Sequence, residues 1–136
     1  MKLSGIFDQT TSFLKKALDL RVRNQQVISS NVANSDTPGY VPARLEFEGS
    51  LQNALGGSGL KLAKTQSGHI GPDEELAAMG AKIVRESKGM NIGDRNEVSV
   101  EEEMVYMAEN QILYEATIQS LNKKYGLLKY IVQGGQ

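Results

Sequence analysis

Apolar side chains recur at alternating steps of three and four residues in two long segments, one at each end of the chain. This spacing is that of a heptad seam, in which an α-helix presents a continuous apolar stripe to a partner helix. Two such helices joined through a flexible middle would pair antiparallel. The sequence therefore predicts a mainly α fold, with long N- and C-terminal helices forming an antiparallel coiled-coil hairpin.

The N-terminal helix is predicted over residues 1–34, which contain no proline and only one glycine. Asn24 and Asn31 occupy seam positions of this helix. A seam asparagine lowers stability but can specify register and partner number. The alternative, that both asparagines face solvent on a looser helix, stays open. The apolar members of the seam are Leu3, Ile6, Phe13, Leu20 and Val27.

The C-terminal helix is predicted over residues 99–136. Ser99 and Glu102 have the spacing of a capping box, in which Ser99 caps the third backbone N–H and Glu102 reaches back. Gly126 is expected to weaken the helix, so that its regular part kinks or ends there. The predicted seam consists of Met104, Met107, Gln111, Tyr114, Ile118, Leu121, Tyr125 and Leu128.

The middle segment, residues 35–98, begins with a turn motif and continues as an irregular, glycine-rich arm. It has few apolar residues to offset the entropy of ordering its backbone, so we expect it to be flexible or extended. A short helix is expected over 47–55, ending at Gly56-Gly57, and a short strand over 60–65. A small β-hairpin within the arm is a further expectation.

A ten-residue motif, Asn31-Val-Ala-Asn-Ser-Asp-Thr-Pro-Gly-Tyr40, separates the first helix from the arm. Pro38 cannot continue a helix and disfavours the α conformation at Thr37, so the helix must end before it. The four residues 37–40 have the pattern of a type II turn, because Gly39 can supply the positive φ at the third position. Local chemistry alone thus gives a helix stop followed by a turn.

The composition excludes several classes of protein. The chain has no cysteine, which excludes disulfides, thiolate metal sites and a cysteine nucleophile. Its formal net charge of -1 gives no reason to expect nucleic-acid binding. No apolar run approaches the roughly 20 residues of a membrane span. The N-terminus also lacks a signal-peptide pattern, so we expect any export to proceed without a cleaved signal peptide.

No pattern in the sequence supports catalysis. The single histidine, His69, lies in a predicted loop without co-ligands for a metal. Phosphate-loop, nucleophile-elbow and HExxH patterns are absent. Glu101, Glu102 and Glu103 point in different directions on a helix and favour stabilisation of its N-terminus over a cation site. We therefore expect no enzymatic activity, cofactor, metal or small-molecule substrate.

The motif at 31–40 resembles the N-terminal signature of bacterial flagellar rod and hook proteins, in which Asn-hydrophobic-Ala-Asn and two further residues precede Thr-Pro-Gly-Tyr. The C-terminal segment narrows the resemblance to the proximal subunits of the basal-body rod protein family. It does so through Val98-Ser-Val-Glu-Glu-Glu-Met104, Ala108-Glu-Asn-Gln111, Tyr114 and Leu121-Asn-Lys-Lys-Tyr125. The resemblance covers nearly the whole chain. One departure is the run of three glutamates, which is more acidic than the family pattern.

This resemblance implies a structural subunit of the flagellar basal-body rod, polymerising through its terminal helices to help form the motor drive shaft across the periplasm. It implies type III export and a position in the periplasmic rod near the inner membrane. The partners it implies are copies of the chain, other rod proteins, the rod-to-export-gate adaptor protein, the inner-membrane ring and the export apparatus.

The residue pattern independently indicates assembly, because each apolar stripe is broader than one partner helix can cover. The turn is therefore interpreted as an assembly element that packs between neighbouring subunits. The competing hypothesis is a soluble helical adaptor or export chaperone of a type III secretion system. The residues assigned to the assembly motif are Asn31, Ala33, Asn34, Thr37, Pro38, Gly39 and Tyr40.

Overall fold

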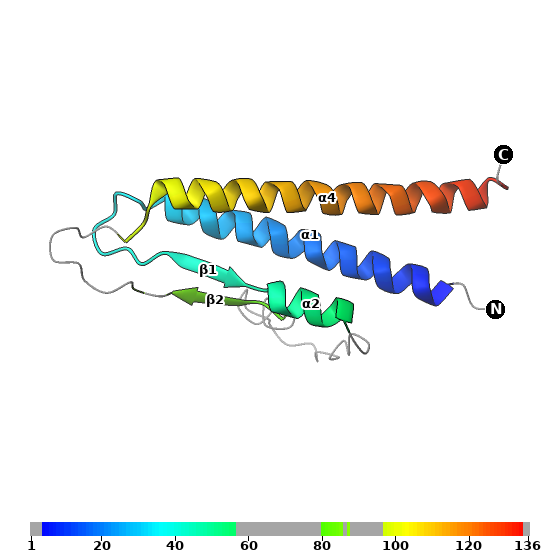
Figure 1. Cartoon of the computed structure of the whole chain (residues 1–136), viewed down its shortest axis with the longest axis horizontal. Helices are drawn as coiled ribbons and strands as arrows, with labels where there is room; N and C mark the ends of the chain where they lie inside the picture. Colours follow the sequence, from blue (N-terminus) through cyan, green and yellow to red (C-terminus); the bar gives the residue numbers. More distant parts are fainter. Residues whose placement is uncertain (1–3, 57–79, 86, 88–96, 135–136) are drawn as a thin grey trace, which may run out of the picture.

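The structure, a computed structural model, describes residues 4–56, 80–85, 87 and 97–134. Its elements in chain order are α1 (Ser4–Ala33), β1 (Ala43–Glu46), α2 (Glu48–Gly56), β2 (Lys82–Arg85) and α4 (Val100–Val132). The predicted fold class is confirmed, because two long terminal helices pack against each other and a small antiparallel sheet lies in the middle (Figure 1).

The two long helices run antiparallel. The first turn of α1 and the last turn of α4 lie at the same end of the molecule (Figure 1). Side-chain hydrogen bonds link Asn24 to Asn110 and Asn31 to Glu103. The later residue of α1 thus contacts the earlier residue of α4, as expected for antiparallel helices. In the described part of the chain, no helix is long and apolar enough to cross a membrane.

Helix α4 begins at a well-formed cap. Ser99 has extended backbone angles, and its hydroxyl oxygen accepts a hydrogen bond from the Glu102 backbone N–H at 3.3 Å. The helix then continues without a break through Gly126 to Val132. The expectation that regular helix ends at Gly126 is therefore wrong. Backbone hydrogen bonds within a long helix are sufficient to carry the chain across a single glycine.

Replacing Gly126 with alanine is expected to stabilise the chain by about 1 kcal/mol, because alanine loses less backbone entropy in a helix. A Cβ atom added at this position meets no atom within 4 Å. Urea unfolding followed by far-ultraviolet circular dichroism measures the gain. Gly80→Ala is the contrasting control, since its φ is +74° and its Cβ would lie 2.8 Å from the Ser50 Oγ atom. An alanine that lowers stability at both positions would contradict the prediction.

The sheet joins two strands that are distant in sequence. β1 pairs antiparallel with β2, and the register places Ala43 opposite Arg85 and Glu46 opposite Lys82. The pair is therefore a ribbon closed over a long connection and not a hairpin with a tight turn. Helix α2 ends at Gly56, which agrees with the short helix predicted there. The strand expected over 60–65 and the loop around His69 lie outside the described residues.

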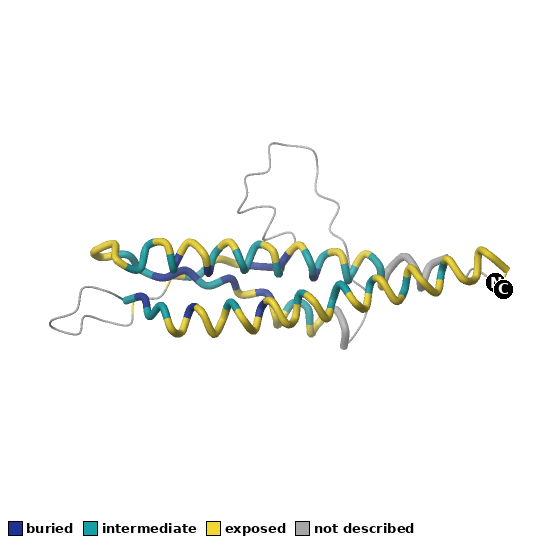
Figure 2. Tube along the Cα trace, turned by 90° about the horizontal axis from the view of Figure 1, so that it is seen from above, coloured by how far each residue is buried: buried dark blue, intermediate teal, exposed yellow. Residues whose placement is uncertain are grey.

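Strand β1 and the residues that flank the two strands supply most of the buried cluster around Leu20. Leu20 of α1 is fully buried against side chains from β1 and the segments beside it, and Val27 and Leu51 pack at the edge of the same cluster. Figure 2 shows the buried residues concentrated where β1 runs along the helix pair. The arm thus covers one side of the hairpin. The remaining members of the buried cluster are Leu45, Phe47 and Ala81.

Candidate assembly site

The turn motif adopts the predicted conformation. The Tyr40 backbone N–H donates to the Thr37 carbonyl at 3.2 Å, and Gly39 has a φ of +74°. These values confirm a type II turn. Asn34 closes the helix end by donating from its side chain to the Ser30 carbonyl at 2.7 Å. The tip of the turn, residues 37–39, is exposed.

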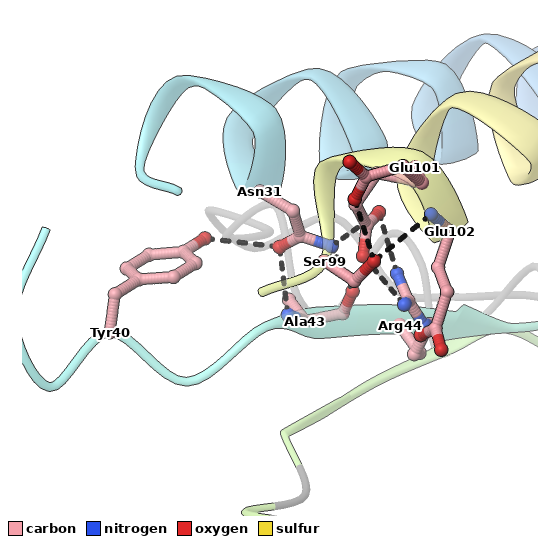
Figure 3. Close-up of polar contacts among 8 residues, drawn as sticks. Asn31, Tyr40, Ala43, Arg44, Ser99, Glu101 and Glu102 are labelled. Atoms are coloured by element: carbon pink, nitrogen blue, oxygen red, sulfur yellow. Dashed lines mark hydrogen bonds and ion pairs between the residues drawn. The ribbon is translucent and has the colours of Figure 1, made fainter. Parts of the chain in front are cut away.

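Asn31 is the buried centre of the motif, with no exposed surface. Its amide nitrogen donates to the Ala43 carbonyl at 2.8 Å and to the Glu103 carboxylate at 3.1 Å. Its amide oxygen accepts from the Ala43 N–H at 2.9 Å and from the Tyr40 hydroxyl at 3.1 Å. These contacts use the full hydrogen-bonding capacity of one amide. As Figure 3 shows, Asn31 joins the end of α1 to Tyr40 and to the start of β1.

Glu103, in the first turn of α4, is also buried, with 1% of its side chain exposed. Arg44 of β1 forms a bidentate ion pair with the Glu103 carboxylate, with Nη2 2.6 Å from Oε1 and Nη1 2.8 Å from Oε2. The hydrogen bonds that Arg44 donates to the Glu103 carboxylate raise the pKa of Arg44 above its ordinary value, whereas partial burial acts to lower it. The guanidinium also lies over the Tyr106 ring at 4.5 Å. The ion pair therefore fastens the arm to α4.

A second polar cluster lies one heptad further along the hairpin. Asn110 of α4 is 3% exposed and donates to the Arg21 carbonyl and to the Gln25 side chain, both at 2.9 Å. Its oxygen accepts from the Asn24 side chain at 3.1 Å. Both seam asparagines of α1 thus face α4 and not solvent, which resolves the alternative that the sequence left open.

The apolar residues predicted for the N-terminal seam occupy different surroundings. Leu20 and Val27 pack against the arm. Phe13 lines a groove bounded by α1, α2 and α4. Leu3 lies outside the described residues, and Ile6 lies in α1 with a side chain that is not described. The structure therefore brings the described part of this seam toward the arm, while polar residues make the hydrogen-bonded contacts with α4.

The C-terminal seam in the structure is shifted to one side of the predicted one. Four predicted members are half-buried at seven-residue spacing: Met107, Tyr114, Leu121 and Leu128. Four positions before each of these stands a second set whose members are also at least half-buried: Glu103, Asn110, Thr117 and Lys124. Each of these four residues comes one position before a predicted seam residue, Met104, Gln111, Ile118 and Tyr125 respectively. Met104 is 62% exposed, Gln111 and Tyr125 are exposed, and Ile118 is half-buried. The polar contacts of Glu103 and Asn110 account for this rotation.

Sequence patterns did not point to Arg44, Glu103 or Asn110. A signal was nevertheless present, because four polar residues recur every seven positions: Glu103, Asn110, Thr117 and Lys124. Such a repeat can share a face with apolar residues only if partners satisfy the polar groups. For Glu103 and Asn110 these partners come from β1 and α1, at separations of 59 residues for Arg44–Glu103 and 86 for Asn24–Asn110.

Large apolar side chains remain exposed along α4. Val105 and Ile112 follow the buried residues Glu103 and Asn110 by two positions, which is about 200° around a helix. They are 57% and 66% exposed and therefore lie on the face turned away from α1. Leu127, Tyr130 and Ile131 are also more than half exposed. Figure 2 shows α4 exposed along most of its length. A helix that is apolar on several faces is typically buried by more than one neighbour.

Comparisons with known proteins agree with the motif and with the helices. The family described as "Flagella basal body rod protein" matches residues 13–40. The flagellar basal body rod protein FlgB of Bacillus subtilis is 32% identical over 132 residues, covering 97% of this chain and 99% of the relative. The Aeromonas hydrophila protein of the same name is 32% identical over 124 residues, covering 90% and 92%. That of Salmonella typhimurium is 26% identical over 133 residues, covering 94% and 96%.

Proposed function

This chain belongs to the FlgB family of flagellar basal-body rod proteins, and we propose that it builds the rod through the outer faces of its helix hairpin. The family assignment makes it a structural subunit of the basal-body rod. In this function the hairpin is a packing unit: α1 and the arm cover one side of α4, and neighbouring subunits cover the rest.

The observation that carries the proposal is the exposed apolar surface of α4. Val105 and Ile112 lie opposite the contact with α1, and Met104 is 62% exposed beside it. Contiguous exposed apolar surface marks an interaction site in a soluble chain. Neighbours that approach through a contact that does not close into a ring generate a helical tube.

The exposed turn at residues 37–39 is proposed as a second contact between subunits. Tyr40 is engaged within its own chain, through its hydrogen bond to Asn31 and the Arg85 guanidinium 5.5 Å above its ring. The exposed motif residues, which remain available to a neighbour, are Thr37, Pro38 and Gly39 in the turn and Ala33 at the end of α1. The buried members of the motif hold the turn in place, and the exposed members make the contact.

On the basis of the family assignment, we also propose a proximal position in the rod, in the periplasm near the inner membrane. The partners proposed for it are further copies of the chain, other rod proteins, the rod-to-export-gate adaptor protein, the inner-membrane ring and the export apparatus. Together these proposals describe a rod subunit located at the end of the rod nearest the inner membrane.

The comparisons lend nothing to the alternative of a soluble adaptor or export chaperone. The family is a structural one, and we propose no catalytic role. The arrangement of Asn31, Arg44 and Glu103 uses its polar atoms on one another, which suits a structural network better than a site for chemistry.

Cell fractionation tests the proposed function. The chain, detected with an antibody and carrying no tag on its helices, is expected to sediment with purified basal bodies after detergent extraction of the membranes. A cytosolic chaperone would remain in the soluble fraction, and this result would overturn the proposal. A flagellar export component of known cytosolic location serves as the control for contamination.

A further inference from the structure

Two polar contacts between α1 and α4 lie one heptad apart on both helices. Asn24 meets Asn110, and Asn31 meets Glu103, so the residue numbers of each pair add to the same value. Continuing this register places Ala17 opposite Thr117, and these two residues line the same groove. One register therefore accounts for three successive levels of the hairpin.

The apolar part of α4 does not select this register. Met107, Tyr114, Leu121 and Leu128 repeat every seven residues, so a shift of α4 by one heptad puts another apolar member of this set in three of the four places. Apolar contacts are not directional, and such shifts would cost little in the described part of the seam. Something else must discriminate among the possible registers.

We propose that the Asn24–Asn110 and Asn31–Glu103–Arg44 contacts determine the register of the hairpin. A shift by one heptad in either direction moves Glu103 about 10 Å along the helix axis, away from both Arg44 and Asn31. It also separates Asn110 from the Arg21 carbonyl and the Gln25 side chain, which now satisfy its nitrogen. Each buried group left without a partner disfavours the shifted register by roughly tenfold or more.

The Arg44 contact ties this register to the rest of the molecule. Arg44 belongs to β1, and Asn31 binds the Ala43 backbone on the same strand. The strand therefore acts as a fixed reference for both helices at the end where the turn motif lies. Correct register then sets the position of the exposed turn along α4.

The natural chain contains no cysteine, so pairs of introduced cysteines report register without interference. Ala17→Cys with Thr117→Cys reports the observed register. Ala17→Cys with Lys124→Cys reports a shift of one heptad, because these positions are otherwise about 10 Å apart along the axis and beyond the reach of a disulfide. The full chain is purified, oxidised mildly and analysed for intramolecular disulfides.

In the native background, only the 17/117 pair is expected to form a disulfide. In the triple variant Asn24→Leu/Glu103→Leu/Asn110→Leu, both pairs are expected to form, with the shifted disulfide rising from background to a yield comparable with the other. A matched triple variant at exposed positions, Gln26→Leu/Glu109→Leu/Asn122→Leu, is expected to keep only the 17/117 pair.

Other outcomes overturn the proposal. A triple variant that forms only the 17/117 disulfide would show that apolar packing alone selects the register. A triple variant that forms neither disulfide and loses its helical circular dichroism would show that the polar contacts create the pairing and do not choose among registers. This measurement on the purified chain is independent of rod assembly, so its failure is distinguishable from failure of the proposed function.

Discussion

Asn31→Ala is expected to destabilise the hairpin by about 3 to 5 kcal/mol, the largest effect of any single side-chain truncation in the motif. The free energy of unfolding falls because several buried polar groups lose the Asn31 amide as their hydrogen-bond partner. The Ala43 N–H and C=O groups are buried and have their partners in Asn31, and Glu103 also loses a donor. A buried polar group without a partner costs about 1 to 3 kcal/mol. A small domain of marginal stability would be largely unfolded by the sum.

Urea unfolding of the full chain, followed by circular dichroism, measures this effect. Asn34→Ala is the matched control, because it removes the same side chain from the same motif at a half-buried position. Its main contact is a hydrogen bond to the Ser30 carbonyl, so its expected cost is about 1 kcal/mol. Equal costs for the two alanines would show that burial of the Asn31 network contributes little.

Arg44→Met is expected to cost about 3 kcal/mol, and Glu103→Gln only about 1 kcal/mol. The two partners of this ion pair differ in exposure, 38% for the Arg44 side chain and 1% for Glu103. Removing the arginine leaves a buried carboxylate without its counter-charge, whereas removing the charge from Glu103 leaves a guanidinium that reaches water. Methionine keeps an unbranched apolar side chain at this position but removes the guanidinium that lies over the Tyr106 ring, so the measured cost includes that contact.

A double-mutant cycle sharpens this prediction. The double variant Arg44→Met/Glu103→Gln is expected to be more stable than Arg44→Met alone. Glutamine is neutral, so the double variant has no buried carboxylate that lacks a counter-charge. The free energies of unfolding of the four proteins give the coupling directly. Additive costs, or a double variant less stable than Arg44→Met, would contradict the assignment of Glu103 as a buried charge compensated by Arg44.

Local signals in the sequence were sufficient for the end of α1, the turn that follows it and the start of α4. Pro38 and Gly39 predicted both the stop of α1 and the type II turn, and the structure has both. Ser99 predicted the start of α4, and its hydroxyl caps the helix. Each of these signals acts within four residues, where backbone geometry and capping are decided by the residues themselves.

The rotation of α4 could not be predicted in the same way. Periodicity gives the direction of an apolar stripe but not which edge of a broad stripe meets the partner. That choice depended on Glu103, which local reasoning assigned only to stabilising the start of the helix. Its partner Arg44 stands 59 residues earlier, in a strand that pairs with β2 across another long gap. The seven-residue repeat of polar residues in α4 indicates that partners are needed, but compensation between residues so distant leaves no local pattern that identifies them.

The contact between the two ends of the chain also has a kinetic consequence. Asn31 and Glu103 are 72 residues apart, and Asn24 and Asn110 are 86 apart, so hairpin formation requires closure of a large loop. Non-local contacts of this kind form late, because the entropy of closure is lost before any contact compensates for it. The two long helices therefore cannot pair until the last quarter of the polypeptide is present.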